Sequence, residues 1–143
     1  MIYTDTRDPS VRVDFKTAVV SGMNATTGGL YMPVELPKLG SNILNKTSEP
    51  SFREIAYETI KPFVEGEIPD NDLQEIIMDA YPFNAQVVPL DPQSYVLELF
   101  HGPTCAFKDF ALQMLPRLLP AAARKCGSDK TVAILVATSG DTG

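Results

Sequence analysis

The fold class rests on two stretches of sequence, Tyr95-Val96-Leu97-Glu98-Leu99-Phe100 and Thr131-Val132-Ala133-Ile134-Leu135-Val136-Ala137. Both are rich in β-branched, aliphatic or aromatic residues, which predicts strands, and the second lacks polar alternation, which predicts burial of both its faces. Between them, apolar residues recur at helical spacing over residues 107–118, so we expect a helix that begins at Thr104 and is kinked in its second half by Pro116 and Pro120. Strand, helix and strand in this order predict a βαβ unit and therefore a parallel sheet.

The first half of the chain has helical patterns instead of strand patterns. Ser51 and Glu54 have the spacing of a capping box, which predicts the start of a helix, and Pro62 should bend or end this helix. Helices are expected over the ranges 14–21, 51–63 and 70–80. We therefore predict an α/β protein with a mostly helical region at 1–84 and the incomplete beginning of an α/β domain at 85–143. The stretch Pro89–Gln93 is the most linker-like part of the chain.

The composition excludes several classes of function. With 143 residues, of which 44% are hydrophobic and 21% charged, the chain suits a folded domain. The net charge of −6 and the scattered basic residues argue against nucleic acid as a partner. No apolar stretch approaches the about 20 residues that a membrane span needs. The N-terminus lacks a signal-peptide pattern, so we expect a cytoplasmic protein in which Cys105 and Cys126 are free thiols. The single histidine, His101, is expected in a turn or in the core, and no metal site is predicted.

Two segments of this chain have residue types suited to chemistry. The second predicted strand leads into Ala137-Thr138-Ser139-Gly140-Asp141-Thr142-Gly143, a turn of small and hydroxyl-bearing residues. In open α/β sheets ligands bind beyond the carboxyl ends of strands, and such a turn offers backbone amides and hydroxyls to an anion. Lys108 follows the first predicted strand, in the stretch His101–Phe110. From its position alone, Lys108 is most simply a solvated surface lysine.

The two segments taken together change this interpretation of Lys108. The motif Gly102-Pro103-Thr104 with Phe107-Lys108-Asp109-Phe110, followed by Ala137–Gly143, resembles threonine synthases. These are pyridoxal 5'-phosphate (PLP) enzymes of the tryptophan-synthase-β fold type, also called fold type II. The stretches Tyr3–Arg7 and Gly28–Pro33 are also similar to the opening of that family, so the resemblance covers nearly the whole chain.

The resemblance implies a site and a reaction. Lys108 would hold PLP covalently and then act as the base that moves protons at the substrate. The substrate carboxylate would be bound by the turn residues Ser139, Gly140, Asp141 and Thr142. The implied reaction converts O-phospho-L-homoserine and water to L-threonine and phosphate. Because enzymes of this family are longer, this chain would hold only the N-terminal part of the site and would be inactive alone. Residues 131–137 would then be an exposed sheet edge through which copies can associate.

Other functions remain open from the residues alone. Asp141-Thr142-Gly143 matches the short signature of aspartic proteases, but Thr138-Ser139-Gly140 separates it from the predicted strand. A nucleophilic Ser139 would lack the glycine of a nucleophile elbow, because Ala137 stands there, and only His101 could be its base. The more serious alternative is a truncated relative that folds or binds a partner without activity. A further alternative is that the protein has a related PLP lyase activity.

Overall fold

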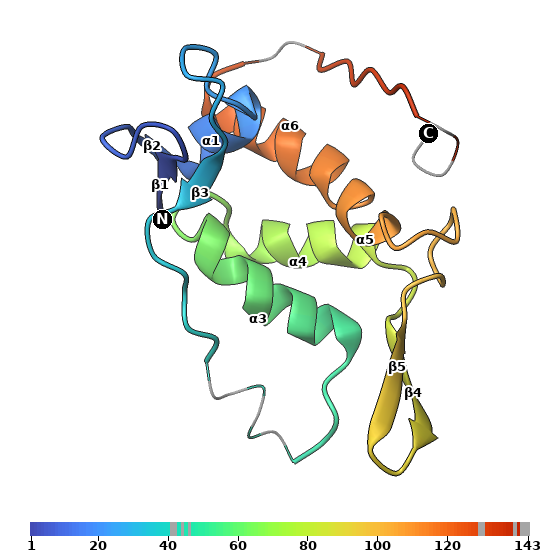
Figure 1. Ribbon diagram of the computed structural model, residues 1–143. Helices are drawn as coiled ribbons and strands as arrows, with labels where there is room; N and C mark the ends of the chain where they lie inside the picture. The colour runs from blue at the N-terminus through green and yellow to red at the C-terminus, as the bar shows by residue number, and fades with distance from the viewer. Residues whose placement is uncertain (41–42, 44, 46, 129–130, 139, 141–143) are drawn as a thin grey trace.

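The computed structural model of the chain describes residues 1–40, 43, 45, 47–128, 131–138 and 140. Figure 1 shows a body of helices with a small sheet at one side and a β-hairpin that projects from the body. The strand orders are β2-β1-β3 in one sheet and β4-β5 in the other, and every strand pair is antiparallel. The fold is mixed α/β, as expected, but the described residues form no parallel pair of strands.

The N-terminal sheet leads directly into the first helix. Its strands are β1 (Ile2–Asp5), β2 (Arg12–Asp14) and β3 (Tyr31–Pro33). Helix α1 (Phe15–Ser21) begins where β2 ends, because the Asp14 carboxylate accepts a hydrogen bond from the backbone N–H of Thr17 at 3.0 Å. Gly22, with φ of 66°, ends the helix as the sequence predicts.

The cap of α1 should make the stability of the protein depend on pH. Hydrogen bonds from Lys16 and Thr17 lower the pKa of Asp14 from 3.8 to about 2. A lowered pKa means that this carboxylate stabilises the fold above its unfolded value and that the contribution is lost as the pH falls through the folded value. Asp14→Asn keeps a capping acceptor but removes the titrating group. We expect the free energy of unfolding to fall less between pH 5 and pH 2 in the variant, measured by urea unfolding. Equal decreases in both proteins would contradict this.

Helices α3 (Phe52–Val64) and α4 (Asp70–Ala80) pack against each other in the centre of the body (Figure 1). The predicted capping box is present: Ser51 Oγ accepts from the Glu54 N–H at 3.3 Å, and the Glu54 carboxylate accepts from the Ser51 N–H at 2.8 Å. The helix continues through Pro62 to Val64. Pro62 is tolerated because it lies in the last turn, where little of the helix follows the missing N–H.

The predicted helix from Thr104 is two shorter helices, α5 (Asp109–Leu112) and α6 (Leu115–Lys125). Pro116 lies in the first turn of α6, where a missing N–H costs little, so it starts a helix instead of kinking one. Pro120 lies inside α6, and the helix continues past it to Lys125. Helix α6 packs against α1 and α4. The buried cluster that joins these helices to α3 and the N-terminal sheet includes Tyr3, Phe15, Ala18, Ala56, Val64, Leu73, Ile77, Met114 and Ala122.

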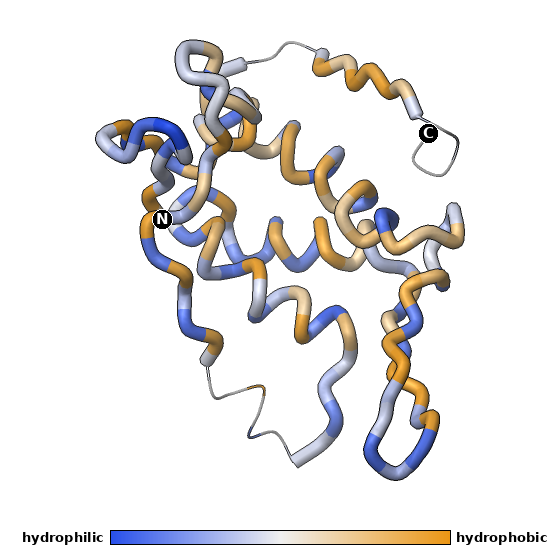
Figure 2. Tube along the Cα trace, in the orientation of Figure 1, coloured by the Kyte–Doolittle hydropathy of each residue, from blue (hydrophilic) through white to orange (hydrophobic). Residues whose placement is uncertain are grey.

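The hairpin consists of β4 (Gln86–Asp91) and β5 (Ser94–Glu98), with Val88 opposite Val96. The strand expected over 95–100 is therefore confirmed in its first part. The interpretation of Pro89–Gln93 as a linker is wrong, because Pro89 lies within β4. Figure 2 shows hydrophobic residues along the hairpin. Those exposed by 50% or more are Val87, Leu90, Tyr95 and Leu97.

The second predicted strand is not formed. Residues 131–138 have no strand structure and are exposed. Leu135, which is 96% exposed, is the most exposed large apolar residue of this segment. A strand needs a neighbour that accepts and donates its backbone hydrogen bonds, and β5 pairs with β4 instead. The βαβ unit, the parallel sheet and the sheet edge expected from this segment are consequently absent from the described part of the chain.

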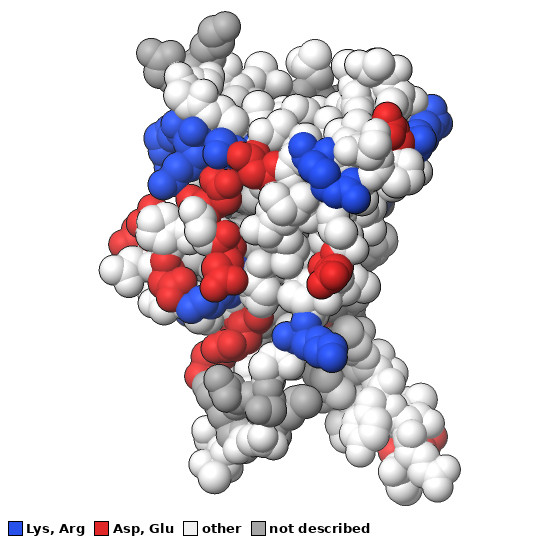
Figure 3. Space-filling model, turned by 90° about the vertical axis from the view of Figure 1, so that its left-hand side faces the viewer, with Lys and Arg blue, Asp and Glu red and all other residues white. Residues whose placement is uncertain are grey.

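Charged side chains of both signs lie close together on the face shown in Figure 3. Two of the ion pairs of the molecule join Lys16 to Asp14 at 2.7 Å and Lys61 to Asp70 at 2.6 Å. Within the described ranges, none of the helices has the length and apolar character of a membrane span.

Candidate functional site

The predicted site residues fall in two segments, and the structure describes only one of them in full. In the turn after residue 138, Gly140 has φ of 128° and its N–H donates to Thr138 Oγ1 at 3.1 Å. Ser139, Asp141 and Thr142 lie outside the described residues, so their binding of a substrate carboxylate stays a prediction. Of the predicted site residues, Lys108 and Gly140 are described, and Lys108 is the one with a reactive side chain.

Lys108 lies directly before the first turn of α5. Its backbone is already helical, with φ of −62° and ψ of −21°, and its carbonyl accepts from the N–H groups of Ala111 and Leu112 at 3.0 and 2.8 Å. The side chain is partly exposed, and its Nζ lies 5.9 Å from the centroid of the Phe107 ring. Phe107 itself is 64% exposed because it precedes the helix. Lys108 is therefore partly in contact with solvent.

The loop before Lys108 is closed by a buried carboxylate. Asp109 is 1% exposed, and its Oδ2 and Oδ1 accept from the backbone N–H and the hydroxyl of Thr104 at 2.9 and 2.8 Å. The expectation that the helix begins at Thr104 is wrong, because α5 begins at Asp109, whose carboxylate binds Thr104. The turn between them is tight, since the Cys105 N–H donates to the Gly102 carbonyl at 3.1 Å and Cys105 has φ of 57°.

Phe110 anchors the other side of Lys108 in the aromatic part of the core. Its ring lies 5.3 Å from the rings of Phe52 and Phe83, measured between centroids, in edge-to-face arrangements. Its carbonyl accepts a hydrogen bond from the Tyr81 hydroxyl at 2.7 Å, and burial raises the pKa of Tyr81. The backbone that carries Lys108 is thus fixed both before and after the lysine.

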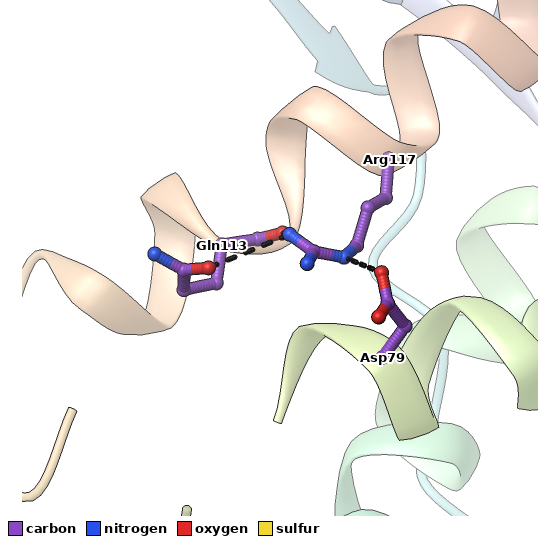
Figure 4. Close-up of polar contacts among 3 residues, drawn as sticks. All are labelled: Asp79, Gln113 and Arg117. Atoms are coloured by element: carbon purple, nitrogen blue, oxygen red, sulfur yellow. Dashed lines mark hydrogen bonds and ion pairs between the residues drawn. The ribbon is translucent and has the colours of Figure 1, made fainter. Parts of the chain in front are cut away.

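A polar contact joins the break between α5 and α6 to α4 (Figure 4). Arg117 Nε donates to the Asp79 carboxylate at 2.5 Å, and Arg117 Nη1 donates to the Gln113 carbonyl at 2.7 Å. Asp79 is the last acidic residue of α4, so this arginine ties the end of α5 to the helix that also carries the core. The ion pair is largely exposed at Asp79, and its main effect is on geometry rather than stability.

His101 has a partner that sequence reasoning missed. Its Nε2 lies 2.7 Å from Glu98 Oε2, and both side chains are partly buried. Glu98 and His101 are three residues apart, which is the only signal in the sequence for this contact. Because β5 ends at Glu98, neither strand nor helix geometry predicts that the two side chains meet. Asp109 was missed as the loop-closing residue for a similar reason: its contact with Thr104 depends on the turn and not on a periodic pattern.

Gly102 allows the close approach of Asp109. A Cβ at Gly102 would lie 2.3 Å from Asp109 Oδ2 and 2.6 Å from Asp109 Cβ. Gly102→Ala should therefore push the carboxylate away from Thr104 and reduce the free energy of unfolding by about 1–3 kcal/mol. Urea unfolding of the two proteins measures this. A change within about 0.5 kcal/mol would show that the loop can accommodate the methyl group and that the contact is not tight.

Solved structures with a similar fold include threonine synthases. The enzyme from Escherichia coli matches with a TM-score of 0.82 and 34% sequence identity, over 99% of this chain and 32% of that chain. A PLP-bound threonine synthase from Brucella melitensis matches with a TM-score of 0.78 and 35% identity, over 89% of this chain and 28% of that one. The fold is that of the N-terminal region of these enzymes.

Sequence comparison gives the same family. The family model for the threonine synthase N terminus matches residues 2–81. Threonine synthase from Pseudomonas aeruginosa is 41% identical over 148 aligned residues, and a mouse protein named threonine synthase-like 2 is 41% identical over 149, each alignment covering the whole chain. The chain belongs to the threonine synthase family. It spans 31% of the length of the Pseudomonas relative and 30% of the mouse relative.

Proposed function

We propose that this chain forms the N-terminal part of a PLP-dependent threonine synthase, which converts O-phospho-L-homoserine and water to L-threonine and phosphate. The observation that carries the proposal is the placement of Lys108: a primary amine on a partly exposed side chain, next to a closed loop, within a chain of this family. The Brucella melitensis threonine synthase of similar fold is PLP-bound, which supports the cofactor. On this proposal, residues 85–143 begin a parallel-sheet domain of fold type II, in which residues 131–137 pair with strands that the described residues do not contain.

The residues that are described fit the attachment of PLP. Covalent attachment requires a primary amine that a small molecule can reach, and the partly exposed Lys108 beside the Phe107 ring provides one. The pairing of Asp109 with Thr104 leaves this carboxylate engaged inside the loop instead of in an ion pair at the site. When bound, PLP supplies an electron sink for the bonds of the substrate's α-carbon.

The roles proposed for this chain's own residues follow from that attachment. Lys108 would hold the cofactor through Nζ and, after the amino group of the substrate has taken the place of the lysine, would take and return protons at the same atom. Ser139, Gly140, Asp141 and Thr142 orient the substrate carboxylate through backbone N–H groups and hydroxyls. The partner is a small molecule, O-phosphohomoserine. The cytoplasmic location and the association of copies stay predictions from the sequence.

The alternative is a relative without threonine-forming activity, either truncated or acting on a related substrate. The mouse relative is named threonine synthase-like 2 and not threonine synthase, so relatives of this chain do not all carry the name of the enzyme. This difference in names is the observation that supports the alternative. A related PLP lyase would use the same lysine. The distinction therefore depends on substrate and product and not on attachment of the cofactor.

The assay that tests the proposal compares two polypeptides: these 143 residues alone, and the complete product of the reading frame that contains them. With O-phosphohomoserine, we expect the complete product to release phosphate and threonine in equal amounts. The 143 residues should show no turnover, because a site that lacks positioning groups loses most of its rate. Turnover by the 143 residues would contradict the second expectation. A complete product that releases product only from serine or cysteine precursors, or a frame that ends at Gly143, would favour the alternative.

A further inference from the structure

Asp109 carries a buried carboxylate that is hydrogen-bonded to the loop before Lys108. Only Asp5 and Asp109 are buried carboxylates among the described residues, each 1% exposed. Both oxygens of Asp109 are used on one residue, Thr104, through its backbone N–H at 2.9 Å and its hydroxyl at 2.8 Å. Gly102 provides the space for this carboxylate, because a Cβ there would overlap it. Burying a carboxylate is costly, so hydrogen bonds as good as these are needed to keep it in place.

The contact fixes the position of Lys108 from its N-terminal side. The two hydrogen bonds connect Thr104 to Asp109 and thereby close residues 104–109 into a ring that includes the lysine. On the C-terminal side, the Phe110 carbonyl is held by the Tyr81 hydroxyl at 2.7 Å. Lys108 therefore lies on a short piece of backbone with an anchor at each end. With the Asp109 side chain removed, the loop before Lys108 would keep backbone hydrogen bonds, such as that from the Cys105 N–H to the Gly102 carbonyl at 3.1 Å, but would lose both side-chain contacts that close it.

We propose that Asp109 is a positioning residue, which holds the loop so that the Lys108 amine meets the cofactor. The inference rests on the proposed attachment of PLP to Lys108 and deepens it. Asp109 acts through Thr104 and the backbone and does not itself touch the cofactor. Holding a reacting amine in place matters for rate, because a displacement of about 1 Å can lower a rate by about 100-fold.

Substitutions at Asp109 and Thr104 separate geometry from charge. Asp109→Ala removes both acceptors to which Thr104 donates. Asp109→Asn can keep both contacts, because its Oδ1 accepts from the Thr104 N–H while its Nδ2 donates to the Thr104 hydroxyl. Thr104→Val keeps the shape but loses the hydroxyl contact, so its effect should lie between the two. Rescue by asparagine is expected only if hydrogen-bonded geometry, and not charge, is what Asp109 contributes.

Asp5 provides a matched control at a distance from the loop. Its carboxylate is equally buried, and it accepts from the Arg7 N–H at 2.6 Å and from the Thr27 hydroxyl at 2.5 Å. Asp5 thus also closes a loop through a threonine hydroxyl and backbone N–H groups, those of Arg7 and Asp8, but at the end of β1. Asp5→Ala should destabilise the fold as Asp109→Ala does, without displacing Lys108. It separates a general loss of stability from a local effect on the lysine.

The experiment uses the complete product of the reading frame, at a temperature where circular dichroism shows every variant folded. PLP is added, borohydride fixes it at timed intervals, and mass spectrometry of the peptide with Lys108 gives the rate of attachment. Hydrogen exchange at the Thr104 amide reports the state of the loop. We expect Asp109→Ala to slow attachment about 100-fold and to lose protection at Thr104. Asp109→Asn and Asp5→Ala should attach PLP at the rate of the unchanged protein.

Each other outcome overturns the inference in a recognisable way. If Asp109→Ala attaches PLP as fast as the unchanged protein, Asp109 does not position Lys108, whereas the proposed function stands. If Asp5→Ala slows attachment equally, the effect of Asp109 is one of stability, and the positioning role is wrong. If Asp109→Asn is as slow as Asp109→Ala, the charge and not the geometry is required. If the unchanged protein attaches no PLP at Lys108, both the inference and the proposed function fail.

Discussion

Lys108→Ala is expected to abolish the covalent attachment of PLP to the complete product of the reading frame. The chain would lose the one amine that the loop at residues 101–109 presents, and no other side-chain nitrogen within this loop can form the same bond, since the imidazole of His101 is not a primary amine. Borohydride fixation followed by mass spectrometry should find labelled peptide in the unchanged protein and none in the variant. Threonine formation should fall by several orders of magnitude, since loss of a covalent catalytic residue removes its whole contribution.

Lys125→Ala is the matched control for this substitution. Lys125 is exposed in the last turn of α6, where its loss removes a favourable charge from the helix end but no part of the loop. This variant should retain the label on Lys108. Labelling of another lysine in the unchanged protein, with Lys108 unmodified, would end the assignment of Lys108.

The helices of the first half are predictable because their signals are local. Ser51 and Glu54 lie three residues apart and satisfy each other's backbone N–H groups, whatever the rest of the chain does. Gly22 ends α1 for an equally local reason, since a left-handed residue favours glycine. These residues fix where α1 and α3 begin or end before any tertiary contact is considered.

The second half is less predictable because its elements depend on distant partners. Pro89 suggests a linker in sequence, but pairing with Tyr95 makes it part of a hairpin. Residues 131–137 have a strand pattern, yet a strand forms only beside another strand, and β5 is already paired with β4. The loop at Lys108 is a third case: Asp109 reaches Thr104 only because Gly102 has no side chain, which no periodic pattern reveals.

The core on which the site rests should be very sensitive to substitution at Leu73. This residue of α4 is 0% exposed and belongs to the buried cluster that joins α1, α3, α4 and α6. Leu73→Ala is expected to lower the free energy of unfolding by about 2–5 kcal/mol, through lost apolar burial and the cavity left behind. Because domains of this size are stable by only about 5–15 kcal/mol, this is a large part of the total. Urea unfolding followed by circular dichroism measures it.

Met78→Ala tests whether the effect comes from burial or from the helix itself. Met78 lies on the same helix and is 62% exposed, so its loss should change the free energy of unfolding by no more than about 0.5 kcal/mol. Equal effects at Leu73 and Met78 would contradict the placement of the core between α4 and its neighbours. The contact from this region to the Lys108 loop is made by Tyr81, which follows α4 and holds the Phe110 carbonyl. In molecules that remain folded, Leu73→Ala should therefore leave the attachment of PLP unchanged, which separates the stability of the body from the geometry of the lysine.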